Sequence, residues 1–284
     1  MKCKLLALDI DGTILTTGNK ITAKTINILN VAREKGLLVT LATGRNYLNV
    51  KHIAKKLKIT LPVISNDGAY IVNIPDSTVI FEKRMVKEAA YKIIQTLDKY
   101  DLRYMIHHES VNIINRRMRF PGILGCLSKK ALGIMLYEKG TVKIVHKNEI
   151  FRFIDAANIE PFKFSAMVDC GFKGRIDEVA FELADKLGSE ISIYSSMPEG
   201  FEITSKGISK AKGLEVLARQ LGIDKSEIIA IGDSFNDIQM IQYAGLGIAM
   251  GNAPKYVQEQ AKFVTKSNDE NGVAYALEKF YLNV

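Results

Sequence analysis

Apolar runs and amphipathic stretches alternate along the first part of the chain. Three apolar runs have the length and composition of buried parallel strands: residues 4–9, 37–43 and 62–65. Between the first two, Thr22 is suited to cap a helix that Gly36 would end. After the second, apolar residues recur at steps of three and four from Tyr47 to Leu57, which predicts another helix. Strands alternating with helices indicate a parallel sheet.

The last part of the chain returns to the same alternation. Strands are expected at residues 228–231, 246–250 and 263–265. Helices are expected at residues 210–221, at 238–243, after Pro254 and at 273–280. Both ends of the chain therefore predict an α/β fold, in which helices cover both faces of one parallel sheet.

The middle of the chain has a different pattern. After a hairpin-like stretch at 70–82, it contains helical segments and several strand candidates, with a poorly patterned segment at 115–140. The strand candidates are residues 103–107, 111–114, 142–146, 162–168 and 191–195. We therefore expect an inserted α+β domain at 84–195, between two parts of the core at 1–83 and 196–284.

Composition narrows the class of protein. Hydrophobic residues make up 47% of the 284 residues, and charged residues 25%, which suits a soluble protein with a sizeable core. No apolar run approaches the length that spans a bilayer, and because the acidic motif begins within nine residues of Met1 we expect no signal peptide. Cys3, Cys126 and Cys170 are far apart and odd in number, which favours reduced thiols in the cytoplasm.

The net charge of +8 favours anionic partners, either phosphorylated metabolites or nucleic acid. The tightest basic group is Arg116, Arg117 and Arg119, and no nucleic-acid-binding motif surrounds it. A solvated basic face is therefore the favoured interpretation, and we expect neither a nucleic-acid nor a membrane partner.

Two carboxylates, Asp9 and Asp11, directly follow the first strand. Open α/β sheets bind ligands at the carboxyl ends of their strands, so these side chains are expected in that crevice. Gly12 permits a sharp turn there. Because adjacent carboxylates repel each other, a hard divalent cation is expected beside them, and magnesium suits a site with few carboxylates.

Three further segments carry chemistry suited to phosphate. Asp233 and Asp237 follow the strand at 228–231, which should lie beside the first strand. Thr43 and Gly44 offer a hydroxyl and backbone N–H groups after the second strand. Lys210 stands at the start of a helix. Together the segments predict a phosphoryl site.

These motifs, in this order, closely resemble those of the haloacid dehalogenase-like superfamily, and of its Cof-type phosphatase branch in particular. The motifs are Asp9-Ile10-Asp11-Gly12-Thr13, Ala42-Thr43-Gly44-Arg45, Lys210 and Gly232-Asp233-Ser234-Phe235-Asn236-Asp237. The resemblance covers essentially the whole chain and implies a Rossmann-like core interrupted by a large cap domain. One position departs from the pattern, because Ala211 follows Lys210 where the family usually has glycine.

The resemblance implies a role for each motif residue. Asp9 would be the nucleophile that becomes phosphorylated, and Asp11 the general acid and base. Asp9, Asp233 and the main-chain carbonyl of Asp11 would hold magnesium, with Asp237 in support. The residues that grip the phosphoryl oxygens would be Ile10 through its backbone, Thr43, Gly44, Lys210 and Asn236.

We therefore expect a magnesium-dependent phosphatase acting on a small phosphorylated metabolite, such as a sugar phosphate. Two alternatives stay open: a phosphosugar mutase that uses the same aspartate, and a non-catalytic phosphate sensor. Asp11 speaks against a sensor, since an acid and base at this position would shorten the life of a phosphorylated switch. The sequence leaves the oligomeric state undetermined.

Three residues near these motifs have two interpretations each. Asp67, in Asn66-Asp67-Gly68, is explained equally well by a type I′ turn and by a contact with substrate. His107 and His108 lie near a strand end in the insert, where local packing or exposure to solvent is favoured over a contact with substrate.

Overall fold

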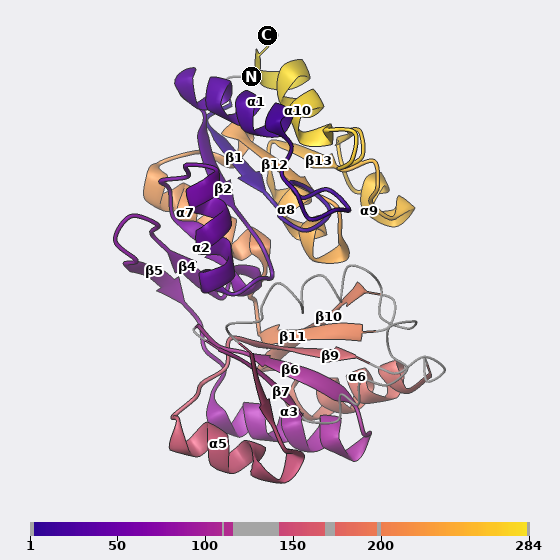
Figure 1. Ribbon diagram of the computed structural model, residues 1–284. Helices are drawn as coiled ribbons and strands as arrows, with labels where there is room; N and C mark the ends of the chain where they lie inside the picture. The colour runs from indigo at the N-terminus through magenta and orange to yellow at the C-terminus, as the bar shows by residue number, and fades with distance from the viewer. Residues whose placement is uncertain (1–2, 110, 116–141, 168–173, 198–199, 283–284) are drawn as a thin grey trace. The chain divides into compact units, whose positions relative to one another are not determined.

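The computed structural model describes residues 3–109, 111–115, 142–167, 174–197 and 200–282 (Figure 1). The chain forms two compact units. The core unit combines Met1–Glu82 with Ser209–Val284, and the inserted unit is Lys83–Ile208. Arg116, Arg117, Arg119, Cys126 and Cys170, which the sequence singled out, lie outside the described residues.

A parallel five-stranded sheet forms the centre of the core unit, in the order β14-β13-β12-β1-β2. Its strands are β1 (Leu5–Leu8), β2 (Leu38–Leu41), β12 (Ile228–Gly232), β13 (Leu246–Ala249) and β14 (Phe263–Val264). All four residues of β1 are fully buried, because β1 lies between β12 and β2. The expected parallel sheet is confirmed, and so is the expectation that the strand before Asp233 pairs with the strand before Asp9.

Helices pack on both faces of this sheet. They are α1 (Ala23–Glu34), α2 (Tyr47–Lys56), α7 (Lys210–Leu221), α8 (Ile238–Tyr243), α9 (Lys255–Glu259) and α10 (Gly272–Leu277). Helix α1 lies against α10, and α7 lies against α8. Leu214 and Leu217 of α7 pack with Leu5 and Ala7 of β1 in one hydrophobic cluster. Thr22 caps α1 as predicted, since its side chain accepts a hydrogen bond from the Thr25 backbone N–H at 3.1 Å.

A small antiparallel sheet extends the core unit beyond β2. It consists of β3 (Val63–Ser65), β4 (Tyr70–Val72) and β5 (Val79–Glu82), with a 3₁₀ turn at Asn66–Gly68 between the first two strands. A parallel bridge between Ala42 and Ile64 joins β3 to the segment that follows β2. The Asn66–Gly68 turn is thereby placed beside Thr43 and Arg45.

The inserted unit has a six-stranded sheet in the order β10-β11-β9-β6-β7-β8. The strands are β6 (Arg103–His107), β7 (Asn112–Asn115), β8 (Val142–Val145), β9 (Lys163–Met167), β10 (Ile191–Met197) and β11 (Gly200–Ser205). Pairing is antiparallel throughout except between β7 and β8. Buried apolar residues of α3 (Lys87–Lys99), α5 (Ile150–Ala156) and α6 (Gly174–Leu187) share one hydrophobic cluster with the sheet.

The second domain boundary differs from the prediction. The inserted unit ends at Ile208, whereas the sequence placed its end at residue 195. The reason is β11, which pairs with both β9 and β10 and buries Phe201 and Ile203 in the cluster of the inserted unit. The first boundary lies after Glu82, one residue before the expected one.

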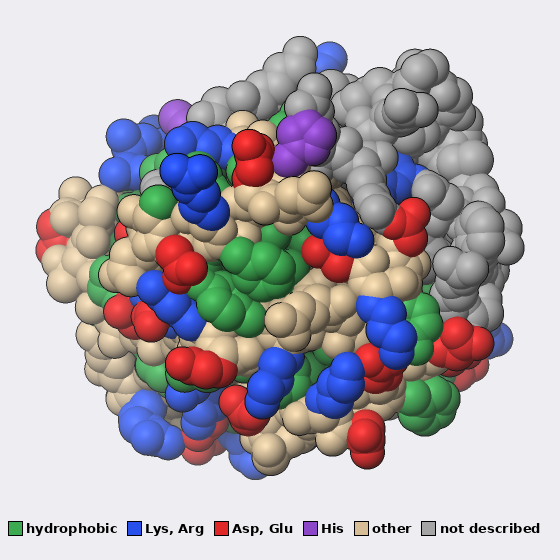
Figure 2. Space-filling view, turned by 90° about the horizontal axis from the view of Figure 1, so that it is seen from below, with side chains coloured by type: hydrophobic (Ala, Val, Ile, Leu, Met, Phe, Trp, Pro, Cys, Tyr) green, Lys and Arg blue, Asp and Glu red, His purple; other side chains and the backbone are tan. Residues whose placement is uncertain are grey.

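Charges of both signs alternate on the face of the inserted unit that carries α3, α5 and α6 (Figure 2). Ion pairs occur among them: Glu182 contacts Lys99 at 2.7 Å and also pairs with Lys186. Among the described residues of this face, basic side chains are therefore interspersed with acidic ones, unlike the continuous basic surface that nucleic acid requires. Within the part of the chain that the structure describes, no helix is both long enough and apolar enough to span a bilayer.

Candidate active site

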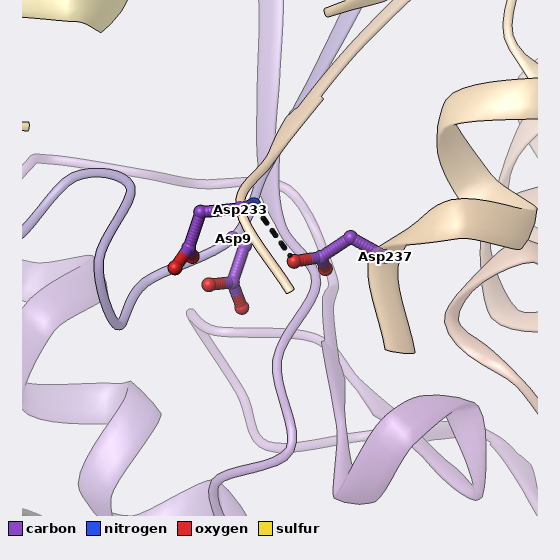
Figure 3. Close-up of side chains that lie close together, drawn as sticks. All are labelled: Asp9, Asp233 and Asp237. Atoms are coloured by element: carbon purple, nitrogen blue, oxygen red, sulfur yellow. Dashed lines mark hydrogen bonds between the residues drawn. The ribbon is translucent and has the colours of Figure 1, made fainter. Parts of the chain in front are cut away.

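Three acidic side chains meet where β1 and β12 end (Figure 3). Asp9 follows β1 and Asp233 follows β12, and the Asp9 backbone N–H donates to the Ile231 carbonyl at 3.0 Å. Asp237 completes the group from the turn before α8. One carboxylate oxygen from each residue lies within 4.8 Å of the others, and all three residues are at least 95% buried. Carboxylates this close and this buried could together hold a metal ion.

Gly12 allows the Asp233 carboxylate to lie directly against the first motif. Its φ of +80° is in the region that favours glycine, and a Cβ there would be 2.3 Å from Oδ2 of Asp233. Thr13 Oγ1 also donates to Oδ1 of Asp233 at 3.1 Å. Gly12 and Thr13 therefore fix where the Asp233 carboxylate points.

Lys210 connects the acidic residues. Its Nζ is 2.6 Å from Oδ1 of Asp9 and 2.6 Å from Oδ1 of Asp237, and the residue is 1% exposed. Burial alone would lower the pKa of Lys210, but the carboxylates of Asp237, Asp9 and Asp67 outweigh this effect and raise the pKa. The lysine therefore carries its charge inside the site.

Ala211 does not displace this lysine. Helix α7 begins at Lys210, and the Ser209 side chain caps it by accepting from the Lys212 backbone N–H at 3.2 Å. Ala211 packs against the hydrophobic cluster of the core unit. The departure from the family pattern therefore leaves the start of the helix where the motif requires it.

Asp237 is occupied by protein donors on both oxygens. Oδ2 accepts from the backbone N–H groups of Asp233 at 3.0 Å and Ser234 at 2.9 Å, and Oδ1 accepts from Lys210. Few lone pairs are left for a cation. Through these hydrogen bonds Asp237 orients the Asp233 loop and Lys210.

The chemistry of this cluster fits a divalent cation. The pKa of Asp9 is raised well above its usual range, mainly by burial, although Lys210 opposes the shift; the nearby carboxylates of Asp237, Asp233 and Asp11 add to it. A cation would relieve this repulsion and restore the ionised carboxylate. Oxygen ligands alone, with no sulfur or imidazole in the cluster, match a hard ion of the magnesium type.

Thr43, Gly44 and Ile10 lie at the same end of the sheet. The Ala42 backbone N–H donates to the Leu8 carbonyl at 2.8 Å, so the chain after β2 runs beside the first motif. Thr43 and Ile10 are buried, while Gly44 is half-buried. The predicted phosphate-binding segment is thereby placed next to Asp9.

Arg45 is a site residue to which sequence reasoning gave no role. Its guanidinium donates from Nε to Oδ2 of Asp11 at 2.7 Å and from Nη2 to Oδ1 at 2.6 Å. The Arg45 side chain is 3% exposed and the Asp11 side chain 17%. A bidentate contact of this kind gives Asp11 a defined position. The sequence did contain a signal for such a role: Arg45 stands just beyond a strand end, in a motif that was expected to bind phosphate.

Asn236 and Asp67 lie together in the core unit. Asn236 Nδ2 donates to Oδ1 of Asp67 at 2.8 Å, and Asp67 is 1% exposed. The carboxylate of Asp67 therefore faces the fourth motif, and the residue also sits in a turn with φ of +54°. The left-handed turn expected from the sequence is present; the alternative, a contact of Asp67 with substrate, stays a prediction.

His107 and His108 of the inserted unit are packed locally. His107 is 6% exposed, and its Nε2 lies 2.6 Å from Ser165 Oγ. His108 stacks on Phe162 and contacts Arg84 at 3.2 Å, and burial lowers its pKa. The local packing that the sequence analysis considered is therefore present at both histidines.

Comparison with known proteins agrees with this geometry. The sequence profile of the haloacid dehalogenase-like hydrolases matches residues 6–277. The chain is 32% identical to the stress response protein YhaX of Bacillus subtilis (strain 168), over 99% of this chain and 94% of that protein. It is 31% identical to the phosphatase YwpJ of the same organism, over 96% of this chain and 98% of that protein.

Among solved structures, a subclass IIB sugar phosphatase of the superfamily superposes with a TM-score of 0.79 at 25% identity, covering 98% of each chain. The profile, the relatives and this structure all extend over both units of the chain. These comparisons agree with the order of the motifs, with the fold, and with the meeting of the motif residues at one edge of the sheet. The chain therefore belongs to the haloacid dehalogenase-like hydrolases and is a phosphatase of that family.

Proposed function

We propose that the chain hydrolyses a small phosphorylated metabolite through a phosphorylated Asp9, with magnesium as cofactor. The observation that carries the proposal is the position of Lys210 Nζ, 2.6 Å from Asp9 and buried with it. A lysine in this position holds the nucleophile and offers positive charge to the oxygens of a transferring phosphoryl group.

The reaction takes two steps. An oxygen of Asp9 bonds to phosphorus while the bond from phosphorus to the substrate oxygen breaks, and Asp11 gives that oxygen a proton. Asp11 then takes a proton from water as the water oxygen bonds to phosphorus. The bond between phosphorus and Asp9 breaks, which releases inorganic phosphate and restores both carboxyl groups.

Five residues stabilise the charge of the phosphoryl group in this proposal. Thr43 contributes its hydroxyl, Gly44 and Ile10 contribute backbone N–H groups, and Lys210 and Asn236 contribute their side chains. Each lies on a segment that ends at the carboxyl edge of the core sheet or begins there. Fixed donors of this kind stabilise a transition state because they need no reorganisation as charge develops.

Asp9, Asp233 and the main-chain carbonyl of Asp11 would hold magnesium. When bound, the ion would neutralise charge on the phosphoryl group, so that a carboxylate can approach it. The buried oxygen-only cluster described above supports this assignment.

A sugar phosphate is the substrate class that we propose. The support is the similarity to the solved sugar phosphatase, which extends over both units. The odd number of well-separated cysteines suits the reducing cytoplasm in which such metabolites occur.

The test is a phosphate-release screen over phosphorylated sugars and related metabolites, with and without magnesium, for wild type, Asp9→Asn and a matched control, Asp224→Asn. Asp224 is an exposed aspartate that caps the 3₁₀ turn before β12, at the opposite end of that strand from Asp233. Wild type and the control should release phosphate only with magnesium, and Asp9→Asn should be inactive. Equal turnover by Asp9→Asn would refute the nucleophile. A strict need for a bisphosphate activator would favour the mutase.

A further inference from the structure

The turn at Asn66–Gly68 touches three of the segments proposed to hold the phosphoryl group: the chain after β2, the start of α7 and the fourth motif. The Asn66 backbone N–H donates to the Arg45 carbonyl at 2.9 Å, and that of Asp67 donates to the Thr43 carbonyl at 3.0 Å. Gly68 packs so closely against the start of α7 that a Cβ would be 2.1 Å from the Ser209 carbonyl oxygen. The backbone of the turn is thus held by the chain after β2 on one side and by the start of α7 on the other.

The third side of the turn is the carboxylate of Asp67. It accepts from Asn236 Nδ2 at 2.8 Å, and its charge is among those that act on Lys210. Asparagine would satisfy a left-handed turn position equally well, and it would not place a buried charge there. The turn alone therefore does not account for an aspartate at this position.

A carboxylate differs from every neutral alternative in one respect: when ionised, it only accepts hydrogen bonds. Opposite Asp67, the carboxamide of Asn236 must present its NH₂ group and not its oxygen. That group has two N–H bonds, and Asp67 uses one. The second is held in the plane of the amide, available to another acceptor such as a phosphoryl oxygen.

We propose that Asp67 is a positioning residue of the phosphoryl site, which fixes the carboxamide of Asn236 with its NH₂ group toward the acceptors. The inference rests on the proposed function, since the role of Asn236 as a phosphoryl ligand is part of it. Asp67 acts through Asn236 and touches no reacting atom.

A double-mutant cycle on kcat/KM tests the proposal, with p-nitrophenyl phosphate as the probe substrate. Asp67→Asn keeps the size of the side chain and tolerates the turn, so the fold should persist; it should lower kcat/KM about 10-fold. Asn236→Ala should lower it by a similar factor or more. The double variant should be no slower than Asn236→Ala alone, because Asp67 has nothing left to orient.

The control cycle uses Asn73 and Asp76, in the turn between β4 and β5. Asn73 Nδ2 donates to Oδ1 of Asp76 at 2.8 Å, the same contact in an exposed turn. Asn73→Ala and Asp76→Asn should leave kcat/KM unchanged. The denaturation midpoint of each variant should also be measured. A variant that loses activity but keeps the wild-type midpoint has lost positioning and not stability.

Two results would overturn the proposal: wild-type kcat/KM in Asp67→Asn, or a double variant in which the two losses multiply. If Asp67→Asn does not fold, Asn236→Asp tests the contact from the other side. It sets two carboxylates against each other, and activity above that of Asn236→Ala would also contradict the proposal. An active Asp9→Asn would instead refute the proposed function, whatever the cycle gives.

Discussion

Arg45 donates two parallel hydrogen bonds to Asp11, one to each carboxylate oxygen, at 2.7 and 2.6 Å. Both oxygens of the proposed acid and base are therefore engaged by a buried guanidinium. Each carboxylate oxygen has a second lone pair, so Asp11 can exchange a proton with substrate or water while the guanidinium holds it in place. Arg45 thus sets the position from which Asp11 acts.

Arg45→Gln should impair substrates selectively. The sugar oxygen of a sugar phosphate is a poor leaving group and needs a proton from Asp11, whereas p-nitrophenolate leaves without one. We expect kcat/KM, which reports the steps up to departure of the leaving group, to fall about 100-fold for a sugar phosphate, within the usual contribution of general acid catalysis, and to fall much less for p-nitrophenyl phosphate. Asp11→Asn should show the same selectivity. Equal losses for both substrates would mean that Arg45 has only a structural role.

Gly12→Ala should damage the proposed metal site. The new Cβ would lie 2.3 Å from Oδ2 of Asp233, so the carboxylate must move. A misplacement of about 1 Å can lower turnover about 100-fold in a well-organised site, and we expect a loss of this order. The magnesium concentration for half-maximal activity should also rise. Gly36→Ala is the control, because Gly36 has φ of +95° but open space around it. The idea fails if both variants lose the same activity.

Removing the Phe164 ring should destabilise the inserted unit. Phe164 on β9 is fully buried and packs beside Tyr104, with ring centroids 6.5 Å apart. Phe164→Ala should lower the free energy of unfolding by about 3–5 kcal/mol, as measured by denaturant titration. Phe181→Ala, on the exposed side of α6, should change it little, since Phe181 is 75% exposed. Similar losses for the two variants would contradict the packing described here.

Glu182 should make the stability of the inserted unit depend on pH. Hydrogen bonds from Lys186, Lys99 and Tyr100 lower its pKa from 4.5 to about 2. Because folding favours the ionised form, the stabilisation is complete above the unfolded pKa and is lost as the pH falls from about 5 to about 2. Denaturant titrations should show wild type more stable than Glu182→Gln at neutral pH, with the gap closing in acid. A gap that does not change with pH would exclude this linkage.

Local sequence patterns were sufficient for most elements of the fold. The helix at residues 210–221 and the strand at 103–107 have the predicted bounds, because each has a regular apolar period and clear end signals. Strand β11 was missed although Phe201 and Ile203 alternate with Glu202 and Thr204, as a half-buried strand requires. β11 belongs to the inserted unit because it pairs with β9 and β10. Since the strand was missed, the predicted domain boundary was placed too early in the chain.

By itself, the sequence determined which residue types stand at the strand ends and in what order, since apolar periodicity locates the strands and the motif residues follow directly after them. Only the tertiary structure decided the partners: Lys210 with Asp9, Arg45 with Asp11, and Asn236 with Asp67. Lys210 and Asp9 are separated by 201 positions and Asn236 and Asp67 by 169, so no local pattern encodes these contacts. They form because adjacent parallel strands bring distant segments to one edge of the sheet, where buried charges must find partners.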